Sequence, residues 1–435
     1  MRRGLLAGVA AIGLVVSSVQ AADAASDFSA VTATRVADFL KSIGVNTHFE
    51  YTDGTYASVQ NALTDLTYLG VSQVRDAVPI STGGTPYQQY KASIATAQKS
   101  GIKFDFIVGC GQAIATSLNQ ISGIVQQKAG SVVSIEGPNE VNNSPCSYNG
   151  VHDASNTDAA AREFQVALYA AVKSNTALSN VPVLYYTGNQ PNESVPGHAS
   201  PADYANGHPY PYNGTSPAAR LTQEFTSHFS NQLPYPRQAT ETGYYNNPTD
   251  PAGSGVDSAT QAKLTLDLLM DAYRLGIAKT YLYQLESPYS DPKGTDLDTE
   301  YGLFNQDNSP KAAATAIHNM TGLLADTSSS ATSFTPGNLV YSLSGMPATG
   351  NSLLLEKQNG TYVLVLWAEP TIWNASTHKA VAAPSVSVTV GFAAAPSAIH
   401  KSDPYVDQSQ VLEPAGTSQL VVKLTDHPTF LEIQK

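Results

Sequence analysis

The feature that most constrains the fold is a regular alternation between short apolar strands and amphipathic helices across residues 43–324. Alternating units of this kind build parallel sheets, because each helix returns the chain to the start of the next strand. An open doubly wound sheet alternates in the same way. However, no Gly-x-Gly-x-x-Gly turn follows the first strand, and the pattern reaches eight strands, at which a barrel closes. We therefore predict an α/β chain built on a (β/α)8 TIM barrel.

Glycines and turn residues mark the ends of the expected elements. Gly70 and Gly101, for example, each follow a helical pattern and precede a strand. The stretch 188–201 is rich in Pro, Gly and Asn, so no helix is predicted before the sixth strand. The expected strands cover residues 43–49, 71–78, 102–108, 132–135, 181–186, 204–210, 237–240 and 279–285.

Beyond Asp326 the pattern changes to a polar link followed by short strands of period two. Asn359-Gly360, between two such runs, is the strongest short signal for a β-hairpin. We expect residues 327–435 to form an antiparallel β-sandwich domain and residues 25–326 to form the barrel. The link is short and lacks a long Pro/Ser/Thr tract, which favours a rigid companion of the barrel over a separately tethered module.

The N-terminus has the order of a signal peptide, with Met1-Arg2-Arg3, an apolar run over residues 5–16 and small residues up to Ala24. We expect residues 1–24 to be a signal peptide and the protein to be secreted or periplasmic. No later apolar run is long enough to span a bilayer. In an oxidising compartment Cys110 and Cys146 are expected to pair, the alternative being two free thiols.

The charge balance excludes some partners. Asp and Glu number 35 against 23 Lys and Arg, which gives a formal net charge of −12, and no basic cluster follows the leader. Nucleic acid and an anionic membrane are therefore not expected as partners. Only 13% of residues are charged, whereas Ser, Thr, Asn, Gly and Tyr are plentiful, which suits an exported protein that handles neutral polar ligands.

Two carboxylates follow strands that end at the same face of the predicted barrel. Glu140 comes after the fourth strand and Glu241 after the seventh, and in barrels of this kind the strand ends carry the active site. Cleavage of a glycosidic bond through a covalent intermediate needs two carboxyl groups about 5 to 5.5 Å apart. A lone Glu at a strand end is more often a solvated loop acid. Two of them at these positions favour a catalytic pair.

The motifs around these residues carry a family resemblance. Glu136-Gly137-Pro138-Asn139-Glu140 resembles the Asn-Glu motif after strand four in clan A of the glycoside hydrolases, including its family 39, and Thr240-Glu241-Thr242-Gly243 resembles the clan's nucleophile motif after strand seven. The resemblance implies a retaining hydrolase with Glu140 as acid/base, Asn139 as a substrate contact and Glu241 as nucleophile. The chain departs from the clan in having Pro138 where Trp is usual, and Gln284-Leu285-Glu286 where an aromatic residue is usual.

Further candidates follow from position and from the same resemblance. Arg75, at the end of strand two, would favour an ionised nucleophile, the alternative being an ion pair with Asp76. His208 and Tyr210 resemble the clan's polar aromatic positions near strand six, where a Tyr hydroxyl hydrogen-bonds the nucleophile; the alternative is that both are turn residues.

The remaining candidates are weaker. Glu136 is expected to support the site rather than to perform chemistry. Glu286 is expected to contact substrate or to cap a loop, and His48 to line a subsite or to be a hydrogen-bonded barrel histidine. The tyrosine-rich loops suit stacking against sugar rings.

No cofactor or metal motif is present, so we expect neither. The predicted function is a secreted glycoside hydrolase acting on a carbohydrate substrate. The alternatives are a transglycosidase using the same site and a catalytically inactive carbohydrate-binding protein.

Overall fold

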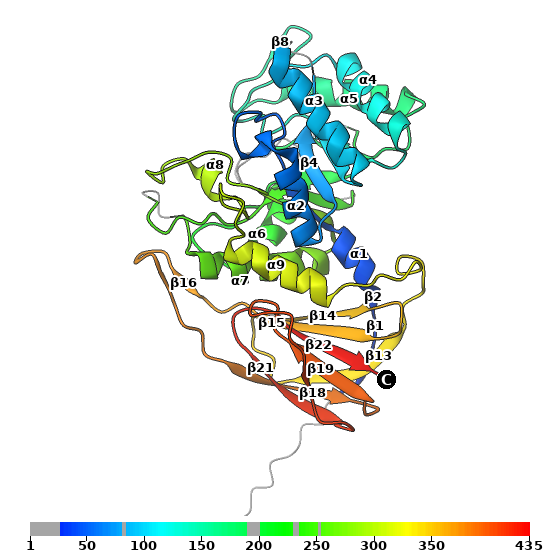
Figure 1. Cartoon of the computed structure of the whole chain (residues 1–435), viewed down its shortest axis with the longest axis vertical. Helices are drawn as coiled ribbons and strands as arrows, with labels where there is room; N and C mark the ends of the chain where they lie inside the picture. Colours follow the sequence, from blue (N-terminus) through cyan, green and yellow to red (C-terminus); the bar gives the residue numbers. More distant parts are fainter. Residues whose placement is uncertain (1–26, 81–83, 189–200, 229–234, 251–253) are drawn as a thin grey trace, which may run out of the picture.

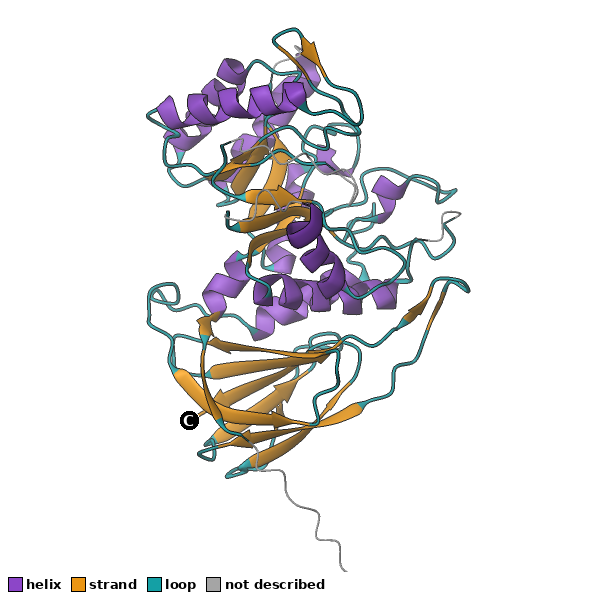
Figure 2. Cartoon of the chain, turned by 180° about the vertical axis from the view of Figure 1, so that it is seen from behind, coloured by secondary structure: helices purple, strands orange, loops and turns teal. Residues whose placement is uncertain are grey.

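The computed structural model describes residues 27–80, 84–188, 201–228, 235–250 and 254–435. The expected signal peptide, and most of the Pro-, Gly- and Asn-rich stretch before the sixth barrel strand, lie outside the described residues. The described chain forms two parts, a barrel covered by helices and a β-sandwich (Figures 1 and 2).

Eight parallel strands form the barrel, as predicted. Their order is β10-β11-β12-β3-β4-β5-β6-β9, and a parallel bridge between Leu184 and Tyr204 joins β9 to the start of β10. The sheet therefore closes on itself. The strands are β3 (Ile43–Asn46), β4 (Gln73–Ala77), β5 (Lys103–Ile107), β6 (Val132–Glu136), β9 (Val183–Leu184), β10 (Ala205–Gly207), β11 (Arg237–Thr242) and β12 (Ile277–Leu282).

Helices cover the outside of the barrel. Local sequence explains several of their ends: Ser58 caps the start of α2 by accepting a hydrogen bond from the Asn61 N–H, and Gly70 ends the helix with a left-handed φ of 68°. The helices are α1 (Val36–Lys41), α2 (Val59–Leu69), α3 (Gly84–Lys99), α4 (Ile114–Gln127), α5 (Ala159–Ser174), α6 (Pro217–Gln223), α7 (Ser258–Arg274), α8 (Leu297–Glu300) and α9 (Ala312–Leu323), with a 3₁₀ turn η1 (Thr55–Ala57) and a π-helical turn η2 (Glu224–His228).

Strand six is shorter than the sequence predicted. The expected strand ran to residue 210, whereas β10 ends at Gly207. Pro209 and Pro211 follow, and proline has no N–H to donate to a strand ladder. His208 and Tyr210 consequently lie in the loop that leaves the strand, at the end of the barrel where parallel strands deliver functional side chains.

The C-terminal residues form the predicted sandwich. One sheet has the order β1-β13-β18-β21 and the other β2-β14-β15-β22-β19-β20. The predicted hairpin is confirmed: β14 pairs with β15 around a turn in which Gly360 has a φ of 86°. The strands are β1 (Ser29–Thr32), β2 (Thr34–Arg35), β13 (Asn338–Ser344), β14 (Gly350–Glu356), β15 (Tyr362–Ala368), β18 (Val386–Phe392), β19 (Ala398–Ser402), β20 (Val411–Leu412), β21 (Gln419–Leu424) and β22 (Thr429–Gln434).

The predicted domain boundary needs one correction. Residues 25–326 were expected to belong to the barrel, but β1 pairs with β13 and β2 pairs with β14. The segment 29–35 therefore supplies edge strands to both sheets of the sandwich before the chain enters α1. Pairing of this kind satisfies backbone groups that an open sheet edge would expose, and sequence periodicity within so short a segment does not reveal it.

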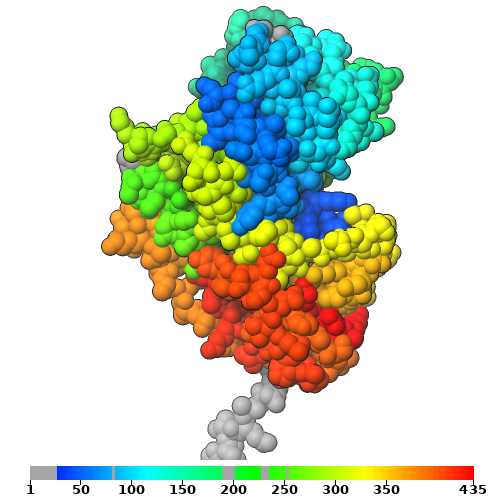
Figure 3. All heavy atoms as spheres, viewed as in Figure 1, coloured from blue at the N-terminus to red at the C-terminus, as the bar shows by residue number. Residues whose placement is uncertain are grey.

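The two parts share a packed boundary. The hydrophobic cluster that fills the barrel continues into sandwich residues such as Val365, Trp367 and Phe430. Figure 3 shows the orange and red atoms of the sandwich lying directly against the yellow atoms above them, without a gap. A hairpin of β16 (Trp373–Asn374) and β17 (Lys379–Ala380) extends from the sandwich alongside the barrel (Figure 2). Among the described residues, no helix has the length and apolar character needed to cross a membrane.

Candidate active site

Glu140 lies in a tight turn beyond β6. Its backbone has a φ of 43°, in the left-handed region that non-glycine residues seldom adopt, and its N–H donates to Thr187 Oγ1 at 3.1 Å. The turn passes close to its neighbours at Gly137, where an added Cβ would lie 2.1 Å from Gln165 Oε1. A larger residue there would displace the Gln165 side chain and crowd Tyr186, whose Cβ and N would each lie 3.1 Å from the added Cβ. The Glu140 side chain keeps 19% of its surface exposed, so a ligand is able to reach it.

Glu241 lies on β11 and is held by two donors. Arg75 Nη1 donates to Oε1 at 2.6 Å and the Tyr210 hydroxyl donates to Oε2 at 2.8 Å. The bond from the Arg75 guanidinium is charge-assisted, and the two bonds together fix the orientation of the carboxylate. Only 9% of the side chain is exposed.

The two carboxylates meet at the carboxyl end of the barrel. Glu140, His208 and Glu241 each offer a ligating atom, and these three atoms lie within 4.8 Å of one another. His208 Nδ1 is 2.8 Å from Glu140 Oε1 and 3.6 Å from Glu241 Oε2. Residues that are a hundred positions apart in the chain therefore present carboxylate oxygens to the same small volume.

Arg75 organises the buried base of this site. Its guanidinium forms a bidentate pair with Glu136, at 2.7 and 2.8 Å. It also donates to Glu241, to Asn139 Oδ1 at 2.6 Å and to Asn46 Oδ1 at 3.0 Å. Arg75 is 2% exposed, and a buried guanidinium is tolerated only when its donors are paired in this way. Glu136 thus supports the site, as the sequence suggested.

The alternative proposed for Arg75, an ion pair with Asp76, is wrong. Adjacent residues of a strand point to opposite faces, and Asp76 instead accepts hydrogen bonds from the Thr47 hydroxyl at 2.6 Å and the Phe49 N–H at 3.1 Å.

His208 is buried between Glu140 and Thr240. Because a carboxylate only accepts, Nδ1–H donates to Glu140, while Nε2 lies 3.2 Å from Thr240 Oγ1. Burial acts to lower the pKa of His208, but the charges of Glu241 and Glu140 outweigh it and the pKa is raised. Burial acts to raise the pKa of Glu140, but the hydrogen bond from His208 outweighs it and the pKa is lowered. The proton of this pair therefore resides on His208.

His48 and Glu286 do not join this network. His48 lies further out, with Nδ1 3.0 Å from Glu50 Oε1 and its ring stacked on Tyr51. Glu286 is fully buried, its N–H donates to the Tyr56 hydroxyl at 3.0 Å, and burial raises its pKa to about 7. A carboxylate without exposed surface is not placed to touch a ligand, so the expected substrate contact by Glu286 is not supported.

Some members of the site were missed from sequence. Asn46, at the end of β3, accepts a hydrogen bond from Arg75. The Thr240 hydroxyl donates to Asn206 Oδ1 at 2.8 Å and accepts from His208 Nε2 at 3.2 Å. Both are polar residues at strand ends on the same barrel face as the carboxylates, and that position was the available signal.

The Glu140, His208 and Glu241 side chains are near enough together to be considered as metal ligands. Both oxygens of Glu241, however, already accept hydrogen bonds from Arg75 and Tyr210. Catalysis without a metal stays a prediction.

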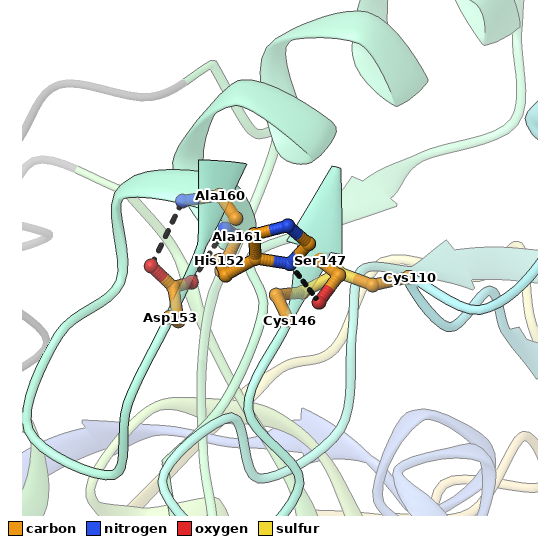
Figure 4. The surroundings of a disulfide bond; sticks show 7 residues. All are labelled: Cys110, Cys146, Ser147, His152, Asp153, Ala160 and Ala161. Carbon is orange, nitrogen blue, oxygen red and sulfur yellow. Dashed lines mark hydrogen bonds between the residues drawn. A yellow bond between two sulfur atoms is a disulfide. The ribbon is translucent and has the colours of Figure 1, made fainter. Parts of the chain in front are cut away.

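The expected disulfide is formed. Cys110 and Cys146 are bonded, with Cα atoms 5.5 Å apart, and the bond joins the loop after β5 to the loop that follows Glu140 (Figure 4). Nearby, Asp153 accepts hydrogen bonds from the N–H groups of Ala160 and Ala161, both at 3.0 Å, at the first turn of α5. The long loop after Glu140 is thus fixed at both ends.

Comparisons with known proteins point to one kind of architecture. No protein-family model matches the chain, and a search of curated proteins found no relative. Solved structures do match. A glycoside hydrolase family 39 β-xylosidase from Caulobacter crescentus aligns with a TM-score of 0.55 and 14% identity over 93% of this chain and 98% of its own.

Two further structures agree with this match. A glucosidase from Croceicoccus marinus aligns with a TM-score of 0.56 and 12% identity over 86% of this chain and 91% of its own. A family 39 enzyme from Xanthomonas axonopodis pv. citri aligns with a TM-score of 0.52 and 13% identity over 92% and 95%. The chain therefore has the TIM-barrel-plus-sandwich fold of these glycosidases along nearly its whole length.

Proposed function

We propose that the protein is a retaining glycoside hydrolase that cleaves O-glycosidic bonds of a carbohydrate substrate. The observation that carries the proposal is the pair of carboxylates, Glu140 and Glu241, whose nearest ligating atoms lie within 4.8 Å while their surroundings differ. Oxygen atoms this close suit direct attack on the sugar, for which the two carboxyl groups lie about 5 to 5.5 Å apart, whereas an inverting enzyme needs about 6.5 to 9.5 Å to admit a water molecule. The shared fold with glycosidases supports the same class.

In the first step Glu241 attacks the anomeric carbon, and the bond from that carbon to the leaving oxygen breaks as Glu140 protonates the oxygen. Arg75 and Tyr210 hold the Glu241 carboxylate in a fixed orientation for attack. Asn139, fixed through its Oδ1 by Arg75, is proposed to contact the sugar.

Glu140 needs a proton for this step, and we propose that His208 supplies it. In the free protein the proton lies on His208. A bound sugar would cover Glu140 and exclude water, which disfavours a charged His208 beside a charged Glu140. The proton would then move along the 2.8 Å hydrogen bond from His208 to the Glu140 carboxyl group. The pair therefore titrates as a unit.

In the second step Glu140 removes a proton from water, the water oxygen attacks the anomeric carbon, and the ester to Glu241 breaks. The product keeps the configuration of the substrate. With a sugar hydroxyl in place of water, the same step would be transglycosylation. Product analysis with and without added acceptor sugar distinguishes the two.

The roles are tested by Glu241→Gln and Glu140→Gln, with Glu163→Gln on the exposed face of α5 as a matched control. Glu241→Gln should abolish hydrolysis of every glycoside. Glu140→Gln should lose natural glycosides but keep the first step on 2,4-dinitrophenyl glycosides, whose leaving group needs no proton. Proton NMR of the first-formed anomer reports retention. Unchanged hydrolysis in both variants, or inversion, would refute the proposal.

We also propose that the protein is exported to the periplasm or the medium. The N-terminal sequence supports this, with its basic start, apolar run and small residues before position 24. Mass spectrometry of the protein made in its own host should find a mature N-terminus near residue 25. An intact Met1 in the cytoplasm would contradict export.

A further inference from the structure

A row of aromatic rings leads away from the carboxylate pair. Tyr210, whose hydroxyl donates to Glu241, has its ring centre 6.4 Å from that of Tyr283. The Tyr283 ring is 5.6 Å from that of His48, which is stacked on Tyr51 at 4.6 Å with nearly parallel planes. These rings come from the loops after β10, β12 and β3, so three separate segments contribute to one surface.

The row ends at Tyr289, the most exposed of its members. Its ring centre is 5.6 Å from that of Tyr51. Exposure rises along the row from 8% at Tyr210 to 39% at Tyr289, as expected for a track that leads from a buried site to the surface.

Tyr289 is held in place rather than free to move. Its hydroxyl donates to Asp53 Oδ1 at 2.8 Å. Its ring lies against Gly54, where an added Cβ would be 2.9 Å from Tyr289 Cε1. An exposed ring fixed in this way presents a preformed flat face, and a preformed face binds with a smaller loss of side-chain entropy.

Beyond Tyr289 lies a polar pocket of about 400 Å³. Its lining includes Asn246, Asn305 and Gln306, whose amide groups both donate and accept hydrogen bonds. The carboxylates of Asp291, Glu300 and Asp307 also line it, against one cation, Lys311. This excess of negative charge disfavours uronic acids and sulfated sugars, whereas neutral hydroxyl groups are able to donate to carboxylates.

We propose that the ring row and this polar pocket form an outer subsite that binds additional residues of a neutral oligosaccharide or polysaccharide. The inference rests on the proposed hydrolase function and specifies its substrate as a chain of neutral sugars. Aromatic faces next to hydrogen-bonding groups match the apolar and polar sides of a sugar ring.

The test compares long and short substrates of the same sugar. The probes are xylo-, cello- and laminari-oligosaccharides of two to six residues, each with its 4-nitrophenyl monoglycoside. In Tyr289→Ala the ratio of kcat/KM for the hexasaccharide to kcat/KM for the monoglycoside should fall roughly 3- to 10-fold, the value of one ring contact. Tyr169→Ala is the matched control, because Tyr169 is a partly buried tyrosine of α5 that also donates to an aspartate, Asp203, at 3.3 Å.

A binding measurement separates this inference from the function on which it rests. Calorimetry of the hexasaccharides with Glu140→Gln, with and without Tyr289→Ala, reads affinity without turnover. Weaker binding in the double variant supports the outer subsite even if no glycoside is hydrolysed. An unchanged ratio and unchanged affinity, or an equal loss on long and short substrates, would overturn the subsite while leaving the hydrolase proposal standing.

Discussion

The barrel and the sandwich bury very different interiors. At the carboxyl ends of its strands the barrel buries Arg75, Glu136, His208 and Glu241, each 7% exposed or less. The core between the two sandwich sheets is a cluster of aliphatic and aromatic side chains, such as Leu364, Val390 and Leu431. Burying charges costs free energy unless each is paired, whereas burying apolar surface is favourable in itself. The barrel end therefore carries a free-energy cost that the proposed function explains, whereas the core between the sandwich sheets gains stability from apolar burial alone.

The largest expected effect comes from breaking the charge network at Arg75. In Arg75→Gln, Glu136 and Glu241 lose their shared cation, so we expect a loss of about 3–5 kcal/mol in the free energy of unfolding. We also expect a fall of about 10² to 10³ in kcat, typical of losing a group that stabilises charge at a reacting centre. Urea unfolding and steady-state kinetics measure the two effects.

The matched change in the sandwich is Leu364→Ala, at a fully buried position. It should cost about 2–5 kcal/mol of unfolding free energy because it leaves a cavity, yet kcat should stay within twofold below the unfolding transition. If Leu364→Ala lowers kcat as far as Arg75→Gln does, the division between a functional and a structural interior is wrong.

A second prediction concerns pH. The pKa of His208 is raised above its ordinary value of 6.5, so the pair keeps its catalytic proton to a higher pH than an ordinary histidine does and loses it as pH rises through that higher value. Activity should therefore decline on the alkaline side of 6.5. In His208→Gln the proton must be held by Glu140 alone, and the alkaline limb of kcat/KM should move to lower pH. If the alkaline limb of the kcat/KM profile stays at the same pH in this variant, His208 does not hold the catalytic proton.

The smallest effect tests whether the two regions are coupled. Trp373, on the sandwich hairpin, is 3% exposed and packs on Gly214, where an added Cβ would lie 2.4 Å from the Trp373 Cβ. Gly214 belongs to the loop that also carries His208 and Tyr210. His378, on the same hairpin, has Nδ1 2.9 Å from the Pro248 carbonyl oxygen in the loop after β11.

Removing the Trp373 side chain should loosen the loop that carries His208 and Tyr210 beside Glu241. We expect Trp373→Ala to lower kcat roughly 3- to 10-fold, because small displacements at a reacting centre are costly. Lys379→Ala, an exposed position on the same hairpin, should change neither kcat nor stability. Wild-type kinetics in Trp373→Ala would show that the sandwich supports the barrel without influencing the site.

Periodicity and motif position predicted most of the fold. The eight parallel strands and the hairpin at Asn359-Gly360 were each visible as local patterns. The disulfide was expected from the predicted export and the presence of two cysteines. The early strands β1 and β2 were not, because their pairing with β13 and β14 spans some three hundred residues and leaves no periodic trace in so short a segment.

The sequence predicted those site residues that lie at or just after the ends of barrel strands. Glu140, Glu241, Arg75, Asn139, His208 and Tyr210 meet in one network. Glu286 follows a barrel strand as well, yet it is fully buried and makes no contact with the carboxylate pair. Sequence position alone does not distinguish a side chain that faces the pocket from one that the next loop covers, and the ring row from Tyr283 to Tyr289 required the loops to be placed in space.

The most direct test of the central claim is to trap the covalent intermediate. A 2-deoxy-2-fluoro glycoside with a 2,4-dinitrophenyl leaving group should inactivate the protein with release of one equivalent of dinitrophenol, and peptide mass spectrometry should find the sugar on Glu241. Labelling of another residue, or steady turnover with inversion and no labelled peptide, would contradict the account.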